Sequence, residues 1–482
     1  MKISDIIYRD EIIISEVDDD LEFDSIKIKI EDTRESDILF ILSQKAADRL
    51  SKENISSVAV VCEQNIILPD FFPTIRIENV RDAFAKACFR YEKFDPHRMK
   101  IIGVTGTNGK STTAELIKHI LSSVGYKVGL IGTGKIEIDR EIISSGSYSM
   151  TTPDPPLLYK SLKQMDERNC DYVVMEVSSH ALALDKLSPL TFDVAVFTNM
   201  SEEHLDFHNN MEKYFAAKYS LLQKSKCAIV NIDDKYGRTA YAKCNGKKIS
   251  AGILWRGEIY ASNIKDLGFD GIEYIYHGKD FYYKARLTTP GIYNAYNSML
   301  ASAVCIELGL KPCEVKAAIN SFTGAQGRYE VINDKISVII DYAHTSFAFE
   351  NILNSLSSIK KHRGLTVVFG CGGDRDKSKR PKMAKIAEKY ADRIILTSDN
   401  SRSESTKDII SDIIRGFDKG SYEIRENRSD AIKRAILDAN DGDIVAIIGK
   451  GPEKYNIDKQ GYHYYNEKDV IMDALKERSG KN

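Results

Sequence analysis

The chain has 482 residues, too many for a single hydrophobic core, so its length predicts two to four domains. Lys and Arg (68) nearly balance Asp and Glu (70), so the net charge is −2. The sequence therefore lacks the excess of positive charge that is typical of proteins that bind nucleic acid. No apolar run approaches the roughly 20 residues that cross a bilayer, and the N-terminus lacks a signal peptide's layout. The eight cysteines are scattered without a C-x-x-C pair, as in reduced, buried thiols. We therefore expect a cytoplasmic protein with no membrane partner.

Apolar runs and helical spacing predict three successive α/β segments. Short apolar runs alternate with helical patterns up to Pro96, which disfavours helix continuation. Strands and helices then alternate as in a parallel sheet with crossover helices. The expected strands lie at 99–105, 127–132, 172–177, 193–198 and 227–232, before a β-rich patch at 258–289, and then at 336–341, 364–370, 393–397 and 443–448. We predict a small N-terminal α/β domain (1–97), a central domain with a parallel sheet (98–328) and a C-terminal Rossmann-like domain (329–482).

A glycine-rich loop stands where the strand at 99–105 passes into a helix at 111–124. Its residues are Gly103-Val104-Thr105-Gly106-Thr107-Asn108-Gly109-Lys110-Ser111-Thr112. Glycines let backbone N–H groups face phosphate oxygens, Lys110 supplies a mobile cation, and Ser111 offers a hydroxyl to Mg²⁺. The alternative is a plain strand-to-helix turn. We predict that residues 106–112 bind the phosphates of ATP and that the central domain is a P-loop ATPase.

The loop is the variant G-x-x-G-T-N-G-K-[ST], which resembles the Mur ligases. Other blocks resemble the MurE type, which adds the third amino acid of the peptidoglycan stem peptide. They follow in family order over about residues 100–455: Thr151-Thr152-Pro153, Met175-Glu176-Val177-Ser178-Ser179-His180, His204-Leu205-Asp206, Tyr214…Lys218, Asn294…Asn297, Gly327-Arg328-Tyr329-Glu330, Asp341-Tyr342-Ala343-His344 and Gly372-Gly373-Asp374-Arg375. The resemblance implies a uridine-nucleotide domain, an ATPase domain and an amino-acid-binding domain, in that order.

A ligase of this kind would first give a carboxylate a better leaving group. Transfer of the ATP γ-phosphoryl makes an acyl phosphate, which an amine attacks, and the moving charge calls for positioned cations. By resemblance, Lys110 would hold phosphates, and Ser111 and Glu176 would bind one Mg²⁺. His204 would bind a second Mg²⁺, although it could also be a polar loop histidine. Lys218 would be carbamylated by CO₂ and ligate Mg²⁺, where the default for a helical lysine is a solvated surface residue.

Two further sets of residues come from the resemblance. Contacts to the base and ribose of ATP would come from Asn294, Asn297, Arg328 and Asp341, unless an Asn merely caps a helix there. UDP-N-acetylmuramoyl-L-alanyl-D-glutamate would meet Thr33, Thr151, Thr152, Ser178 and Lys186. Position 186 departs from the family's Arg, and the family's D-G-H-x-F stretch is missing from the N-terminal domain.

The incoming amino acid would meet Arg375, Asp399, Asn400, Arg402, Gly449 and Glu453. Asp399-Asn400-Ser401-Arg402 resembles the D-N-P-R motif of enzymes that add meso-diaminopimelate, where the Arg faces the distal carboxylate. Glu453 would form an ion pair with the distal ammonium of the amino acid. Ser401 and Pro452 replace the family's Pro and His, and Pro452 removes one backbone N–H.

The sequence thus predicts an ATP- and Mg²⁺-dependent, monomeric ligase that adds a diamino acid, meso-diaminopimelate first, to the UDP-linked dipeptide. One alternative is a paralogue that adds L-lysine or another amino acid, or acts on another carboxylate. Two further alternatives are a folylpolyglutamate synthetase and a non-catalytic binding subunit. The non-catalytic alternative is disfavoured because the chain retains the four residues expected to take part in catalysis, Lys110, Glu176, His204 and Lys218.

Overall fold

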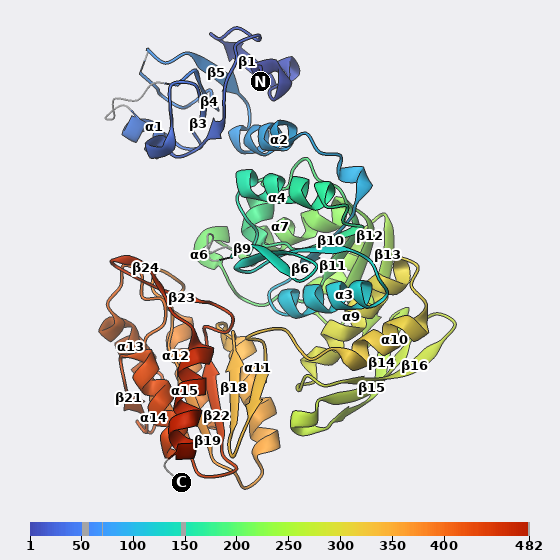
Figure 1. Ribbon diagram of the computed structural model, residues 1–482, viewed down its shortest axis with the longest axis vertical. Coiled ribbons are helices and arrows are strands. Elements are labelled where there is room, and N and C mark those ends of the chain that lie inside the picture. The colour runs from blue at the N-terminus through green and yellow to red at the C-terminus, as the bar shows by residue number, and fades with distance from the viewer. Residues whose placement is uncertain (51–56, 70, 146–150, 481–482) are drawn as a thin grey trace.

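Three sheets follow one another along the chain in the computed structural model, which describes residues 1–50, 57–69, 71–145 and 151–480 (Figure 1). They contain five, eleven and six strands, and a two-stranded hairpin follows the last. Helices cover each sheet. The mixed α/β class and the order of the three predicted units are confirmed, while the domain boundaries remain predictions.

The first sheet has the order β1-β5-β4-β3-β2. Its middle strands are short apolar runs whose side chains are buried, except for Glu63 at the end of one of them. The elements are β1 (Ile12–Ser15), β2 (Ile26–Lys27), β3 (Ile38–Phe40), α1 (Gln44–Leu50), β4 (Ala59–Glu63), β5 (Thr74–Ile77) and α2 (Val80–Glu92). Asn79 caps α2 by accepting from the backbone N–H groups of Arg81 and Asp82, which fixes where the helix begins.

The central sheet has the order β16-β15-β14-β13-β12-β11-β6-β10-β7-β8-β9. Its middle is parallel and both edges continue as antiparallel hairpins, so the predicted β-rich patch extends this same sheet. The strands are β6 (Lys100–Thr105), β7 (Val128–Gly132), β8 (Lys135–Ile138), β9 (Glu141–Ser145), β10 (Tyr172–Glu176), β11 (Phe192–Phe197), β12 (Ser225–Asn231), β13 (Lys247–Gly252), β14 (Ile259–Asp266), β15 (Ile272–His277) and β16 (Tyr282–Leu287).

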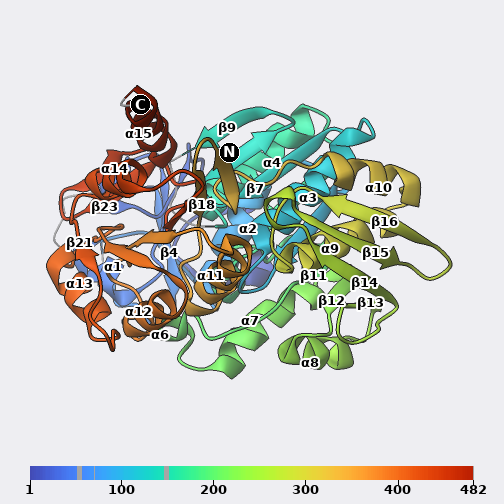
Figure 2. The same ribbon diagram turned by 90° about the horizontal axis from the view of Figure 1, so that it is seen from below.

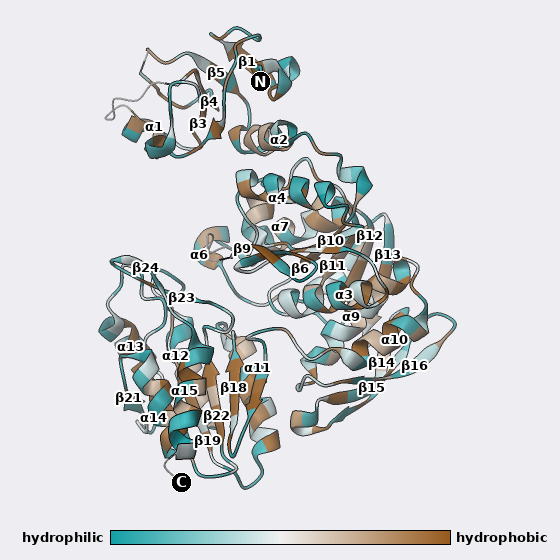
Figure 3. Cartoon of the chain, viewed as in Figure 1, coloured by the Kyte–Doolittle hydropathy of each residue, from teal (hydrophilic) through white to brown (hydrophobic). Residues whose placement is uncertain are grey.

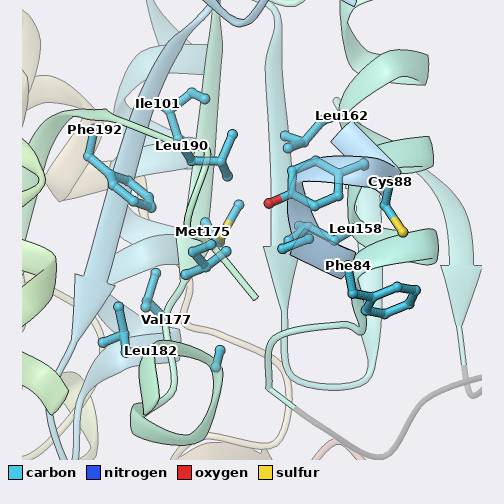
Figure 4. Packing of buried hydrophobic residues seen from close by; sticks show 14 of the residues in the cluster. Phe84, Cys88, Ile101, Leu158, Leu162, Met175, Val177, Leu182, Leu190 and Phe192 are labelled. Carbon is cyan, nitrogen blue, oxygen red and sulfur yellow. The ribbon is translucent and has the colours of Figure 1, made fainter. Parts of the chain in front are cut away.

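Helices cover both faces of the central sheet. One hydrophobic cluster joins the strands to α3 (Lys110–Ser123), α9 (Tyr293–Glu307) and α10 (Pro312–Ser321). The opposite cluster includes α4 (Pro155–Glu167), α5 (Ser179–Ala183) and α7 (Met211–Gln223), with α6 (Leu205–His208) and α8 (Lys235–Lys243) nearby in the chain. This second cluster continues into the N-terminal unit. Figure 4 shows Phe84 and Cys88 of α2 beside Leu158 and Leu162 of α4, so these two units share one core.

The third sheet has the order β17-β18-β22-β19-β20-β21, parallel except for β17. Helices α11 (Ser346–Lys360), α12 (Lys379–Tyr390) and α13 (Thr406–Ile414) cover one face, and α14 (Arg428–Asp438) and α15 (Glu467–Gly480) cover the other (Figure 2). The strands are β17 (Glu330–Asn333), β18 (Ser337–Asp341), β19 (Leu365–Phe369), β20 (Arg393–Leu396), β21 (Glu423–Ile424) and β22 (Ile444–Ile448), followed by the hairpin β23 (Tyr455–Asp458) and β24 (Gly461–Tyr464). This is the doubly wound arrangement that the alternation predicts.

Burial agrees with the apolar patterns of the sequence. Strands β10, β19 and β22 are buried along their whole length, and Figure 3 shows hydrophobic residues on β18 and β22. Seven of the eight cysteines are buried, and all eight are free thiols. Within the described residues, no helix is long and apolar enough to cross a membrane.

Candidate active site

The residues predicted to take part in catalysis lie at the carboxyl ends of the parallel strands of the central sheet. Thr105 ends β6, Glu176 ends β10 and Phe197 ends β11, and these strands are neighbours. The helix α3 begins directly after the glycine-rich loop. Open parallel sheets bind ligands at this edge, where a helix N-terminus also presents unpaired N–H groups to anions.

The glycine-rich loop has a backbone that side chains would not allow. Gly106 (φ 148°) and Gly109 (φ 86°) lie in the region that favours glycine, and a Cβ on Gly109 would overlap Asn297 Oδ1. Lys110 Nζ donates to the carbonyl oxygens of Gly106 (3.0 Å) and Thr107 (2.9 Å). Asn108 Nδ2 is buried and has no hydrogen-bond partner among the described residues. A loop with such a donor and a mobile cation suits a phosphate ligand.

Ser111 and Glu176 are in direct contact. The Ser111 hydroxyl donates to Glu176 Oε2 (2.7 Å), and Thr133 donates to Glu176 Oε1 from its backbone N–H (3.0 Å) and to Oε2 from its hydroxyl (3.2 Å). Glu176 is 4% exposed, and within the described part of the chain it forms no ion pair. A buried carboxylate with neutral partners is costly unless a cation joins it, so Ser111 and Glu176 fit one Mg²⁺.

Lys218 lies on α7 and points into the site. Its side chain is 2% exposed, so the interpretation as a solvated surface lysine is wrong. Its Nζ donates to the Gly106 carbonyl oxygen (2.7 Å), which also accepts from Lys110, and lies 4.6 Å from the centre of the Tyr214 ring. Burial, with the nearby Lys110 ammonium, holds the pKa of Lys218 well below its usual value. Both effects shift the protonation equilibrium of this amine towards its neutral form.

His204 is the N-cap residue directly before α6 and has a left-handed backbone (φ 56°). Its Nε2 lies 3.5 Å from Glu203 Oε1, and burial lowers the pKa of the imidazole to about 3. A neutral imidazole is the form that can ligate a metal. His208 lies at the end of α6, 4% exposed, with its Nε2 2.9 Å from Ser179 Oγ. No group of three or more His, Cys, Asp or Glu side chains suited to a metal occurs in the described ranges.

Glu203 is a site residue that the sequence prediction missed. Its Oε1 lies 3.1 Å from His344 Nε2, although 141 positions separate the two residues. Burial opposes ionisation of Glu203, but the hydrogen bond from His344 and the neighbouring His204 and Lys110 hold its pKa well below the usual range. Thr345 Oγ1 also donates to Asn108 Oδ1 (3.4 Å). These contacts join the third sheet to the phosphate loop.

The four predicted nucleotide residues do not all present free groups. Asn294 Nδ2 donates to the Pro290 carbonyl oxygen (2.7 Å), and Asn297 Nδ2 donates to Asn294 Oδ1 (2.9 Å). Both lie inside α9, whose N-cap is Ile292, so the alternative of an Asn cap is wrong. Asp341 accepts from the backbone N–H groups of Tyr329 and Ala343 (both 2.7 Å).

Arg328 is close to the phosphate loop. Its Nη2 donates to Ser111 Oγ (2.9 Å), and its guanidinium carbon lies 4.3 Å from the centre of the Tyr342 ring. Its Nε is buried and has no hydrogen-bond partner among the described residues. Arg328 therefore reaches the phosphate end of the loop, whereas the sequence suggested the base and ribose.

Three of the five residues predicted to meet the UDP-linked substrate, Thr151, Thr152 and Ser178, are near Glu176, and a fourth, Lys186, contacts Asp154. Thr152 Oγ1 donates to the Glu176 carbonyl oxygen (2.9 Å) and accepts from the Ser178 N–H (3.0 Å). Thr151 Oγ1 accepts from Thr133 (3.3 Å), and Lys186 Nζ lies 2.7 Å from Asp154 Oδ1. The fifth, Thr33, donates to the Lys29 carbonyl oxygen (2.9 Å) within its own loop in the N-terminal unit.

The residues predicted to bind the amino acid meet at the carboxyl edge of the third sheet. Asn400 Nδ2 donates to Glu453 Oε2 (2.7 Å), and a Cβ on Gly449 would lie 3.0 Å from Asp399 Oδ2. Lys450, which the prediction left out, is 0% exposed. Its Nζ donates to Asn400 Oδ1 (3.0 Å) and lies 3.6 Å from both Asp399 Oδ1 and Glu453 Oε2.

The two carboxylates of this pocket, Asp399 and Glu453, have pKa values shifted in opposite directions. Burial opposes the ionisation of Asp399, but Lys450 and Arg428 lower its pKa to about 2. Burial and the nearby Asp399 raise the pKa of Glu453. Glu453 is therefore the carboxylate that gains more from an additional cation.

Arg402 has a left-handed backbone (φ 51°), and its Nη1 donates to the carbonyl oxygens of Gly373 (2.9 Å) and Asn400 (3.2 Å). Among the described residues, Nε and Nη2 of Arg402 have no hydrogen-bond partner, so both can donate to a ligand. Arg375 is exposed on the adjoining loop, and its Cγ would lie 3.9 Å from a Cβ on Gly372. All six predicted amino-acid residues thus belong to one region.

A phosphate loop with buried lysines, facing a doubly wound domain with a charged pocket, defines an ATP-dependent ligase. Residues 104–305 match the family model of the Mur ligase middle domain, and residues 327–451 match that of the Mur ligase glutamate ligase domain. The chain belongs to the Mur ligase family.

Several relatives are similar over most of their length. The UDP-N-acetylmuramoyl-L-alanyl-D-glutamate–2,6-diaminopimelate ligase 1 of Clostridium acetobutylicum is 39% identical over 407 residues, 84% of this chain and 83% of the relative. The corresponding ligase of Clostridium botulinum is 36% identical over 468 residues, 95% of each chain. A solved structure of a UDP-N-acetylmuramoyl-L-alanyl-D-glutamate–2,6-diaminopimelate ligase has a TM-score of 0.66 at 26% identity and covers 99% of both chains.

Proposed function

We propose that this ligase joins meso-diaminopimelate to the glutamate carboxylate of UDP-N-acetylmuramoyl-L-alanyl-D-glutamate, with ATP converted to ADP and phosphate, in peptidoglycan precursor synthesis. The observation that carries the proposal is the pair of lysines, Lys110 and Lys218, that converge on the Gly106 carbonyl oxygen beside Glu176. The names of relatives 36–39% identical over most of the chain support the choice of substrates.

The chain's own groups would act in two steps. In the first, Lys110 would exchange the carbonyl oxygens of Gly106 and Thr107 for the β- and γ-phosphates of ATP, while the substrate carboxylate attacks the γ-phosphorus and ADP leaves. In the second, the amine of the amino acid attacks the acyl carbon of the acyl phosphate, inorganic phosphate leaves, and the amine gives up a proton. Ser111 and Glu176 would hold one Mg²⁺, and His204 with Lys218 a second. Bound Mg²⁺ would neutralise charge on the phosphoryl oxygens.

The surroundings of Lys218 support the proposal that it is carbamylated. The neutral amine nitrogen attacks the carbon of CO₂ and releases one proton, so that an uncharged group becomes an anionic carbamate. The Lys110 ammonium donates to the same carbonyl oxygen as Lys218, so it disfavours a second ammonium there and would attract an anionic carbamate. The carbamate oxygens would also supply a negatively charged metal ligand beside the neutral imidazole of His204.

The two ends of the amino acid would meet complementary groups. Nε and Nη2 of Arg402 can grip a carboxylate through two hydrogen bonds, while Glu453 gains from a cation. Diaminopimelate has both groups at its far end, whereas lysine has an ammonium alone. On the other substrate, Thr151, Thr152, Ser178 and Lys186 would meet the dipeptide. We also propose that the enzyme works as a cytoplasmic monomer.

The test is product formation by the purified protein. With ATP, Mg²⁺, the UDP-linked dipeptide and equal concentrations of meso-diaminopimelate, lanthionine and L-lysine, mass spectrometry should detect the diaminopimelate adduct, with one phosphate released per amide bond. Lys110→Ala should remain folded and form no product. A wild-type protein that favours lysine would contradict the choice of amino acid, and one that forms no amide would contradict the proposal as a whole.

A further inference from the structure

Tyr342 lies between the phosphate loop and the amino-acid pocket. It follows Asp341, the last residue of β18, so it stands at the carboxyl edge of the third sheet. The Arg328 guanidinium carbon lies 4.3 Å from the centre of its ring, within the range of a cation–π contact. The same guanidinium donates from Nη2 to Ser111 Oγ (2.9 Å). The face of Tyr342 therefore contacts a residue that reaches the phosphate loop.

The other end of Tyr342 reaches the amino-acid pocket. Its hydroxyl donates to Glu453 Oε1 (3.1 Å), while Glu453 Oε2 accepts from Asn400 (2.7 Å). The carboxylate is thus fixed at both oxygens. A continuous chain of contacts runs from Ser111 through Arg328, Tyr342 and Glu453 to the pocket.

Backbone packing holds Tyr342 in this place. A Cβ on Gly451 would lie 2.6 Å from Tyr342 Cβ and 2.7 Å from the Gly327 carbonyl oxygen, and a Cβ on Gly327 would overlap the backbone at Pro452. The segment before Arg328, the end of β18 and the loop that carries Glu453 are therefore in direct backbone contact. A shift of Arg328 cannot leave Tyr342 and Glu453 undisturbed, because closely packed groups transmit displacement.

We infer that Tyr342 is a positioning residue: its hydroxyl orients Glu453 for the amino acid, and its ring makes that orientation depend on the occupant of the nucleotide site. The inference rests on the proposed function. Nucleotide phosphates compete with Ser111 for the Arg328 guanidinium, because charged acceptors bind it more strongly than a hydroxyl. Nucleotide and amino acid would then affect each other's affinity reciprocally, through the ring that Arg328 covers.

Two substitutions separate the hydroxyl from the ring. Tyr342→Phe keeps the surface that Arg328 covers and removes the hydrogen bond to Glu453, and Tyr342→Leu removes both. The matched control is Tyr390→Phe, because the Tyr390 hydroxyl also donates to a glutamate, Glu350 Oε1 (3.3 Å), on the helices α11 and α12. The measurements are the KM for ATP, the KM for the amino acid, and calorimetric binding of the amino acid with and without a non-hydrolysable ATP analogue.

For Tyr342→Phe we expect the KM for the amino acid to rise about tenfold, the loss of one hydrogen bond to a charged group, while the KM for ATP stays unchanged. For both variants we expect that the ATP analogue no longer changes amino-acid binding as it does in the wild type, because the path from Arg328 to Glu453 is broken. Tyr390→Phe should behave as wild type. An unchanged KM for the amino acid in Tyr342→Phe, or equal rises in both KM values, would overturn the inference.

Product formation by the wild-type enzyme tests the proposed function separately. If the wild type accepts another diamino acid, the same two KM values are measured with that substrate. A failure of the substrate assignment is therefore distinct from a failure of the role of Tyr342.

Discussion

At the scale of single residues, Lys218 gives the sharpest prediction about the metal-binding groups. Lys218→Ala should reduce turnover at least about a hundredfold, because the anion proposed to hold Mg²⁺ is lost. Added formate or acetate should restore part of the activity by occupying the space of the carbamate. Steady-state rates with and without these acids measure the effect. Wild-type activity in the variant, without added acid, would return Lys218 to a structural role.

Arg402 gives a prediction about amino-acid choice. In Arg402→Ala the distal carboxylate of diaminopimelate loses a charge-assisted partner worth about 1.5–3 kcal/mol, or roughly 10- to 150-fold in affinity. The KM for diaminopimelate should rise by that factor, while the KM for L-lysine, which has no distal carboxylate, should change little. Parallel titrations of the two amino acids measure the difference. Equal increases for both would mean that Arg402 shapes the pocket through its hydrogen bonds to Gly373 and Asn400 and does not select the substrate.

At the scale of elements, the turn that carries Arg402 is anchored to α12 by an ion pair. Arg380, 0% exposed, donates to both carboxylate oxygens of Glu404 (2.9 Å each) and to Asp412 (2.9 Å). The hydrogen bonds from Arg380 lower the pKa of Glu404 to about 2. The pKa is lower in the folded than in the unfolded state, so this stabilisation is complete above pH 4.5 and is lost as the pH falls towards 2.

Glu404→Gln should therefore lower the free energy of unfolding by roughly 3 kcal/mol at pH 7, because it leaves Arg380 with one carboxylate partner. The difference from wild type should shrink between pH 4.5 and pH 2. Urea unfolding at several pH values measures it, and Glu426→Gln, at an exposed position of the same domain, is the control. A difference that is independent of pH would contradict the role assigned to this pair.

The elements could largely be predicted from the sequence, but the contacts between them could not. Regular alternation of apolar strands and helices predicts β6, β10, β11, β19 and β22, because buried parallel strands are continuous apolar runs. The glycines at 106 and 109 predict the phosphate loop, because they allow backbone conformations that other residues rarely adopt. Spacing gives no signal for Glu203 beside His344, since the pairing depends on how two domains meet. The burial of Lys450 was equally hidden, because a lysine is ordinarily exposed.

At the scale of the whole molecule, the site lies where the central and C-terminal units meet, and the N-terminal unit is packed on the opposite side of the central one (Figure 1). Arg328 and His344 of the last third of the chain contact Ser111 and Glu203 of the central unit. The phosphate loop and the amino-acid pocket are thus built by different units. On the proposed function, this arrangement would let one unit activate a carboxylate while the other delivers an amine.

The most direct test of the account is the fate of the carboxylate oxygens. The UDP-linked dipeptide, labelled with ¹⁸O in its glutamate carboxylate, is incubated with the enzyme, ATP, Mg²⁺ and meso-diaminopimelate, and the released phosphate is analysed by mass spectrometry. Activation through an acyl phosphate predicts that one ¹⁸O atom moves into inorganic phosphate for each amide bond formed. Amide formation that leaves the phosphate free of ¹⁸O would contradict the account.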